Sequence, residues 1–212
     1  MTNGFPLLKS MIWSDQRGIV WILFTRFFIL ENLENYILWI KSFVKDEKIG
    51  IDYKILVIYC TLTGLRASEA IESINLIKGD YGRLKYLDSE NNILKHYGFS
   101  KIFIRKTRKA YFSVVDDNVI KIAIASNSQI YSTSKSKFYR NNIEFKLSYC
   151  RKVFATCLRN KGIKPEIINL LQGRISISVF VNHYYRPDID EIITKRIRPV
   201  LDELMKELMN ST

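Results

Sequence analysis

The chain has 212 residues, of which 47% are hydrophobic and 25% are charged. This composition supports one domain with a substantial hydrophobic core, and it excludes a disordered or low-complexity chain. The three cysteines are odd in number and lack the spacing of metal ligands, so they predict neither a disulfide framework nor a metal site. We interpret them as small buried side chains of an intracellular protein: Cys60, Cys150 and Cys157.

The net charge of +12 is concentrated in one third of the chain. Residues 95–164 contain 16 Lys and Arg against three Asp and Glu, whereas the other 142 residues contain 17 against 18. A solvated surface normally mixes both signs. Concentrated positive charge suits a polyanion, because each neutralised phosphate releases condensed counterions. The sequence therefore predicts nucleic acid as a partner.

The most hydrophobic stretch is residues 18–30, GIVWILFTRFFIL. A membrane-spanning helix needs about 20 apolar residues, but this run is shorter, contains Arg26 and is followed by polar residues. A signal peptide would carry its basic residues before the apolar run and a cleavage site after it. We therefore interpret the stretch as a core helix and predict a soluble, cytoplasmic protein without a membrane partner.

Apolar periodicity predicts a mainly helical chain. Helices are expected over residues 18–44 (one or two), 49–59, 66–76, 119–125, 146–161, 166–171 and 188–209. Gly162 is placed to end one helix as a C-cap, and Pro165 to begin the next. Pro199 should kink or divide the last helix.

Residues 101–115, KIFIRKTRKAYFSVV, have a different pattern. Two β-rich runs, KIFI and AYFSVV, flank a polar, basic turn at residues 106–109, which predicts an antiparallel hairpin. With the helices, this predicts an α+β fold that is mainly α with a small antiparallel sheet.

Three separated segments carry the most informative residues. They are TGLRASEA (63–70), SYCRKVFAT (148–156), and LQGRIS (171–176) followed by HYYRPD (183–188). In this order they resemble the motifs of the tyrosine recombinase catalytic domain, most closely the integrases of archaeal viruses and plasmids. The resemblance spans residues 49–188. It implies a catalytic domain over 46–190, a short N-terminal helical segment over 1–45 in place of a core-binding domain, and an amphipathic tail over 191–212.

The chemistry of metal-free phosphodiester cleavage fits these residue types. It needs a nucleophile, cations on the non-bridging oxygens and an acid for the leaving oxygen. The resemblance implies that Arg66 and Arg151 form the phosphate clamp and that Lys106 protonates the leaving 5′ oxygen. Lys109 and Arg108 are the alternatives to Lys106.

The resemblance assigns the nucleophile to Tyr184, directly after His183, with Tyr185 as the alternative. A 3′-phosphotyrosine ester conserves the energy of the broken bond, so neither ATP nor a metal cofactor is expected. Consistent with this, the sequence has no GxxxxGK[ST] phosphate loop, and His96 and His183 show no ligand pattern.

Glu69 follows Arg66 by one helical turn. It would hold Arg66 through a charged pair, or else it is an ordinary solvated partner at that spacing.

Two positions depart from the family pattern. Ser148 stands where the family usually has His or Lys, and Arg174 stands where it has His or Trp. Arg174 still donates to phosphate, whereas Ser148 cannot serve as a cation. Ser148 and the short N-terminal segment keep open a degenerate integrase that binds DNA without cutting it. A type IB topoisomerase, which shares the chemistry but rejoins the original strand, is the other alternative to a recombinase.

Further DNA contacts are expected from Arg105, Arg108, Lys109 and Lys152, mainly to the backbone, which gives affinity with little sequence readout. The short N-terminal segment predicts a minimal or shortened integrase with weak sequence discrimination. The C-terminal stripe has two interpretations. It packs on its own domain, or it docks on a neighbouring protomer in a homotetramer on DNA.

Overall fold

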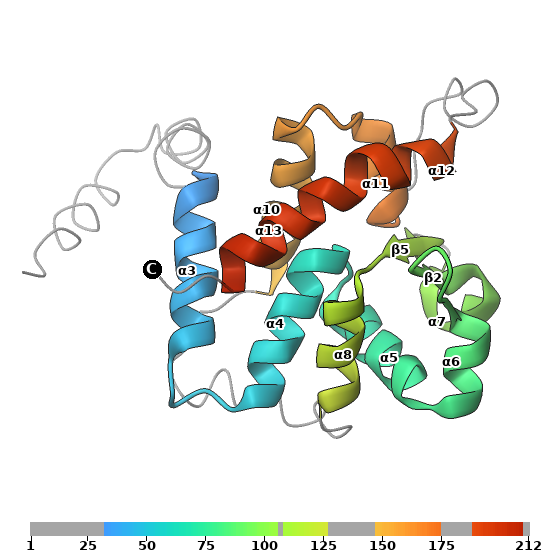
Figure 1. The fold of residues 1–212 in the computed structure, drawn as a ribbon, viewed down its shortest axis with the longest axis horizontal. Helices are drawn as coiled ribbons and strands as arrows, with labels where there is room; N and C mark the ends of the chain where they lie inside the picture. Colours follow the sequence, from blue (N-terminus) through green and yellow to red (C-terminus); the bar gives the residue numbers. More distant parts are fainter. Residues whose placement is uncertain (1–31, 106–107, 127–146, 175–187, 210–212) are drawn as a thin grey trace, which may run out of the picture.

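The computed structural model describes residues 32–105, 108–126, 147–174 and 188–209. These residues form a mainly helical fold with small antiparallel sheets, which confirms the predicted α+β class (Figure 1). The helices in chain order are α3 (Leu33–Lys45), α4 (Ile51–Thr63), α5 (Ala67–Lys78), α6 (Asp80–Tyr86), the 3₁₀-helix η1 (His96–Phe99), α7 (Ser100–Phe103), α8 (Asp117–Ala125), α10 (Ser148–Asn160), α11 (Pro165–Leu171), α12 (Ile189–Ile192), the π-helix η3 (Ile193–Ile197) and α13 (Arg198–Met209).

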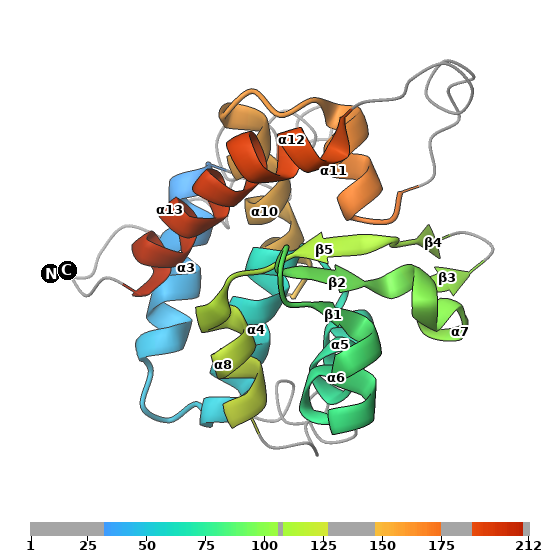
Figure 2. The same ribbon diagram turned by 45° about the vertical axis from the view of Figure 1, so that its right-hand side comes forward.

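Five short strands make two antiparallel units. One sheet has the order β1-β2-β5, and a separate pair joins β3 to β4. Figure 2 shows the strands above α5 and α6. The strands are β1 (Leu87–Asp88), β2 (Ile93–Lys95), β3 (Ile104–Arg105), β4 (Arg108–Lys109) and β5 (Phe112–Val114).

The pairing predicted for the hairpin at 101–115 is wrong. Residues 100–103 form the helical turn α7, and β5 pairs with β2 in the register Leu94↔Ser113. The hairpin that remains is shorter, with Ile104 opposite Lys109. The reason is tertiary, because a strand of three residues gains its stability from burial, and β2–β5 pairing puts Leu94 and Ser113 in the core.

Local signals set most helix ends correctly. Helix α4 is an exception, because it continues beyond the predicted end at residue 59 to Thr63, where Gly64 caps it with a φ of 67° in the left-handed region. Helix α10 ends as predicted, because Gly162 has φ 80°, its N–H donates to Arg159, and the Ile163 N–H donates to Leu158. These two bonds make a Schellman motif. Pro165 occupies the first turn of α11, as expected.

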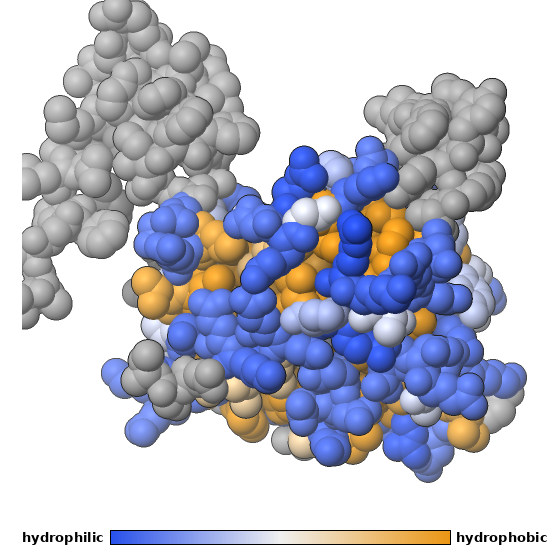
Figure 3. All heavy atoms as spheres, turned by 45° about the horizontal axis from the view of Figure 1, so that its top comes forward, coloured by the Kyte–Doolittle hydropathy of each residue, from blue (hydrophilic) through white to orange (hydrophobic). Residues whose placement is uncertain are grey.

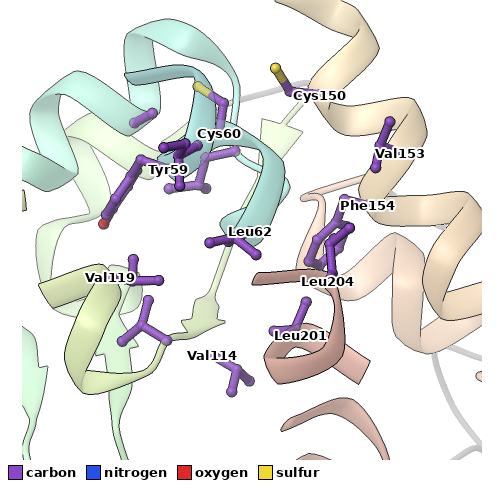
Figure 4. Packing of buried hydrophobic residues seen from close by; sticks show 14 of the residues in the cluster. Tyr59, Cys60, Leu62, Val114, Val119, Cys150, Val153, Phe154, Leu201 and Leu204 are labelled. Atoms are coloured by element: carbon purple, nitrogen blue, oxygen red, sulfur yellow. The ribbon is translucent and has the colours of Figure 1, made fainter. Parts of the chain in front are cut away.

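Helix α4 is the centre of the core. Every side chain from Ile55 to Thr63 is buried, which is typical of a helix enclosed on all sides. It packs against α3, α5, α8, α10 and α13. Figure 4 shows Leu62 of α4 facing Phe154 of α10 and Leu204 of α13. All three cysteines are free and buried, which confirms the prediction of buried thiols.

The C-terminal stripe packs on its own chain. Helix α13 contacts α3, α4 and α10 through side chains that include Leu201, Leu204 and Leu208. The chain widens into the π-helix just before Pro199. Proline lacks the N–H of a regular helix and its ring crowds the preceding turn. The predicted division at Pro199 is therefore confirmed as a change of helix type.

A buried chain of hydrogen bonds ties the sheet to the helices. The Tyr86 hydroxyl donates to Ser73 Oγ at 2.7 Å and lies 2.7 Å from His96 Nδ1. Ser73 is also bonded to Tyr59, and His96 Nε2 lies 2.8 Å from Ser113 Oγ. Burial lowers the pKa of His96 to about 3, so the imidazole is neutral and the chain is a structural network.

The hydrophobic run 18–30, for which we predict a core helix, lies outside the described residues. Within the described ranges, no helix is both long enough and apolar enough to cross a bilayer.

Candidate active site

Arg66 is presented by a sharp turn between two helices. The left-handed Gly64 ends α4, and Arg66 directly precedes the first residue of α5. Its side chain is 26% exposed. The turn places a guanidinium at the N-terminal end of a helix, where anions are favoured by the free N–H groups.

Glu69 holds Arg66 in place. Its Oε1 accepts from Arg66 Nη1 at 3.1 Å, and its Oε2 accepts from the Arg66 backbone N–H at 3.1 Å. The carboxylate is buried, with 3% of its side chain exposed. The predicted charged pair is therefore confirmed, and the solvated alternative is wrong because the carboxylate has almost no access to water.

Arg151 lies in the first turn of α10 and is joined to the end of α11. Its Nη2 donates to the backbone carbonyl of Gln172 at 3.0 Å. In return, Gln172 Nε2 donates to the backbone carbonyl of Arg151 at 2.8 Å. Arg151 Nη1 is buried and has no hydrogen-bond partner among the described residues. A buried N–H without an acceptor is costly, so it is a natural contact for a bound anion.

The charges of the site act on one another. The pKa of Arg151 is lowered to about 10, first by burial and then by the positive charge of Arg66. Glu69 opposes this shift, and Arg174 adds to it. Arg151 is still protonated at neutral pH. Arg66, Arg174 and the buried Glu69, which come from the first and third motifs, therefore all act on the charge of Arg151 in the second.

Two glycines of these motifs bring the segments into close contact. A Cβ on Gly64 would lie 2.6 Å from Phe154 of α10, and a Cβ on Gly173 would lie 2.6 Å from the backbone N of Ala110. Gly173 has φ 64°, and its carbonyl accepts from the Lys109 N–H at 3.2 Å. The first motif is thus packed on the second, and the third motif on the basic hairpin.

Some of the remaining predicted residues are described by the structure, and others lie outside the described ranges. Arg174 is exposed, and its backbone N–H donates to Asn169 at the end of α11. Arg105 and Arg108 are paired across β3 and β4. Lys106, the predicted acid, and Tyr184, the predicted nucleophile, lie outside the described residues, as does the alternative Tyr185.

Lys152 faces α3. Its Nζ lies 5.3 Å from the ring centroids of both Tyr36 and Tyr149 and donates to the Tyr36 hydroxyl at 3.2 Å. These contacts connect α10 to α3. The structure therefore gives Lys152 a packing role beside the DNA contact that the sequence predicts.

Ser148 and Gln172 complete the site. Ser148 is exposed at the first residue of α10, one turn before Arg151. Gln172, which is 1% exposed, was not among the residues predicted from the sequence. Its one sequence signal is a polar side chain that directly follows the apolar helix Pro165–Leu171, and that signal does not name a hydrogen-bond partner.

A cleft of about 430 Å³ lies between α11 and the α12–η3 segment, and Arg66, Arg151 and Arg174 are not part of its lining. Its lining mixes isoleucines with charged residues: Ile163, Lys164, Ile167, Asp188, Glu191, Ile192, Lys195 and Arg196. Figure 3, which brings the α11 and α13 side of the molecule forward, shows hydrophobic surface between hydrophilic side chains. Across the described ranges, no group of three or more His, Cys, Asp or Glu residues could hold a metal ion.

Comparisons of the chain with protein-family models, with curated proteins and with solved structures find no match.

Proposed function

We propose that this protein is a site-specific DNA recombinase of the tyrosine recombinase class. The observation that carries the proposal is the guanidinium of Arg151. Its Nη1 is buried without an acceptor among the described residues, and Arg66 and Arg174 lie near enough for their positive charges to act on it. Guanidinium groups bind the oxygens of a phosphodiester through paired hydrogen bonds. The basic excess of residues 95–164 supplies the wider field that draws DNA to the site.

The proposed chemistry follows from this cation cluster. Arg66 and Arg151 bind the non-bridging oxygens and stabilise the extra negative charge of the pentacovalent transition state. The phenol oxygen of Tyr184 attacks phosphorus as its proton passes to water, and the bond from phosphorus to the 5′ oxygen breaks. Lys106 supplies the proton to the departing oxygen. The 5′-hydroxyl of a partner strand then attacks the phosphotyrosine, the bond from phosphorus to the tyrosine oxygen breaks, and the DNA is rejoined as the Tyr184 phenol is released.

A nicked suicide duplex tests this proposal. The short fragment released by cleavage diffuses away, so a cleaving enzyme is trapped as a covalent complex that survives SDS. Wild type and Tyr185→Phe should form the complex, and Tyr184→Phe should not. An adduct that persists in Tyr184→Phe and vanishes in Tyr185→Phe would move the nucleophile to Tyr185. The absence of any adduct in all three proteins would end the cleavage proposal.

Ser148 favours a second candidate, a degenerate integrase that binds DNA without cutting it. Ser148 cannot provide the cationic group that the family usually has one turn before the second arginine. The same assay separates the two, because binding alone shifts the duplex in a native gel but leaves no SDS-stable complex. Ser148→His should raise the cleavage rate of an active enzyme, and unchanged inactivity in this variant would support the binding protein.

The proposed assembly is a homotetramer on double-stranded DNA. Contacts of the basic hairpin mainly to the DNA backbone would give little sequence discrimination, which is tested by a mobility-shift titration on specific and random duplexes at two salt concentrations. Salt-resistant, nanomolar selectivity for one duplex would contradict it. Relaxation of supercoiled DNA by a monomer, without strand exchange, would instead favour the type IB topoisomerase.

A further inference from the structure

Gln172 is buried to an extent that is unusual for its type. Only 1% of the residue is exposed, although an amide side chain normally stays in water. Burying it requires hydrogen bonds, since an unmet amide loses its contacts with solvent. The amide nitrogen is satisfied, because Nε2 donates a hydrogen bond to the Arg151 carbonyl at 2.8 Å. The amide oxygen, Oε1, has no hydrogen-bond donor among the described residues.

The Gln172–Arg151 pair joins two separate elements. Arg151 belongs to α10, and Gln172 ends α11. The amide anchors the Arg151 backbone, and the Gln172 carbonyl accepts from Arg151 Nη2 at 3.0 Å. The two bonds run in opposite directions between the same two residues. The distance between the helices and the direction of the guanidinium are therefore set together.

This arrangement leaves one edge of the guanidinium free. Nη2 is held by the Gln172 carbonyl, and Nη1 remains without an acceptor in the part of the chain that the structure describes. An arginine side chain held in this way has little rotamer entropy left to lose when it binds a phosphate. We propose that Gln172 is a positioning residue that orients Arg151 for a phosphodiester of DNA. This inference rests on the proposed function.

A double-mutant cycle in DNA binding tests the inference. The proteins are wild type, Gln172→Leu, Arg151→Ala and the double variant, and affinity for an intact duplex is measured over a range of salt. Gln172→Leu should weaken binding about fivefold when Arg151 is present and less than about twofold when it is absent. It should also reduce the salt slope, which is the steepness with which log affinity falls with log salt concentration. The loss of one full phosphate contact reduces that slope by about 0.9.

Controls separate positioning from stability. Ser113→Ala removes a hydrogen bond from another buried network and should lower the melting temperature without changing the salt slope. Gln172→Met serves if the leucine variant does not fold. Equal losses of affinity with and without Arg151, or a salt slope identical to wild type, would overturn the positioning role.

Failure of the proposed cleavage would look different. In that case the suicide duplex yields no adduct, while the binding cycle still reports whether Gln172 acts through Arg151. If adducts form, the same four proteins are compared by cleavage rate, and Gln172→Leu should again cost activity only when Arg151 is present. A wild-type chain with no salt-dependent affinity for DNA would overturn both proposals.

Discussion

Replacing Glu69 with Gln is the most direct test of the arginine site. The carboxylate is 3% exposed and its partner Arg66 is 26% exposed, so the pair is intermediate between a buried and a surface ion pair. Breaking a buried pair costs about 3–5 kcal/mol, and a surface pair contributes about 1 kcal/mol or less. Gln also retains one acceptor for the Arg66 N–H. We therefore expect Glu69→Gln to lower the free energy of unfolding by about 2 kcal/mol.

Thermal unfolding followed by circular dichroism measures this loss. For a chain of this size, about 2 kcal/mol corresponds to a decrease in melting temperature of about 4–8 °C. Glu203→Gln is the matched control, because it makes the same chemical change in the exposed pair with Lys161. It should cost about 0.5 kcal/mol or less. Equal melting temperatures for the two variants would refute the reasoning.

A polyanion should restore part of the lost stability. Without the Glu69 charge, Arg66 and Arg151 repel each other unopposed, and a DNA phosphate supplies the missing negative charge. Adding a short intact duplex should raise the melting temperature of Glu69→Gln more than that of wild type or Glu203→Gln. An identical increase in all three proteins would show that the cation cluster does not bind the phosphate.

Three further predictions follow from single contacts. Gly64→Ala should cost about 2–4 kcal/mol in urea unfolding, because it combines a left-handed backbone with a Cβ 2.6 Å from Phe154. His96 has a folded-state pKa of about 3, below its unfolded value, so its contribution to stability is complete above pH 6.5 and is lost as the pH falls toward 3. Between pH 7 and pH 5 the loss should be about 2 kcal/mol, and it should be absent in His96→Asn. Lys152→Met should lower stability by about 1 kcal/mol through the lost contacts with Tyr36, and it should reduce the salt slope of DNA binding by about 0.9 through the loss of the expected phosphate contact; an unchanged slope would contradict that contact.

The sequence predicted the helices well because their signals are local. Gly64 and Gly162 mark helix ends through their freedom to adopt positive φ, and Pro165 marks a helix start, whatever the rest of the chain does. The pairing of Arg66 with Glu69 is local in the same sense, since both side chains belong to one helical turn. The motif residues Arg66, Arg151 and Arg174 were also identified from the sequence, although their proximity was an inference.

The strand pairing could not be predicted in the same way. The run 110–115 is β-rich, but whether it pairs with 101–104 or with Ile93–Lys95 depends on which partner buries it better. That depends on side chains distant in the sequence. Gln172 was missed for a related reason, because a polar residue after an apolar helix gives no indication that its partner is a backbone carbonyl on α10.

The sequence by itself determined most of the helical segments and their caps, because these depend on neighbours within a turn or two. It also showed the concentration of basic charge, which composition alone reveals. Only the tertiary structure decided that α4 is enclosed on every side, that α13 packs on its own chain, and that Arg151 and Gln172 exchange hydrogen bonds. Those features come from close contacts between segments far apart in the chain. Their free energy depends on burial and distance, which no local pattern encodes.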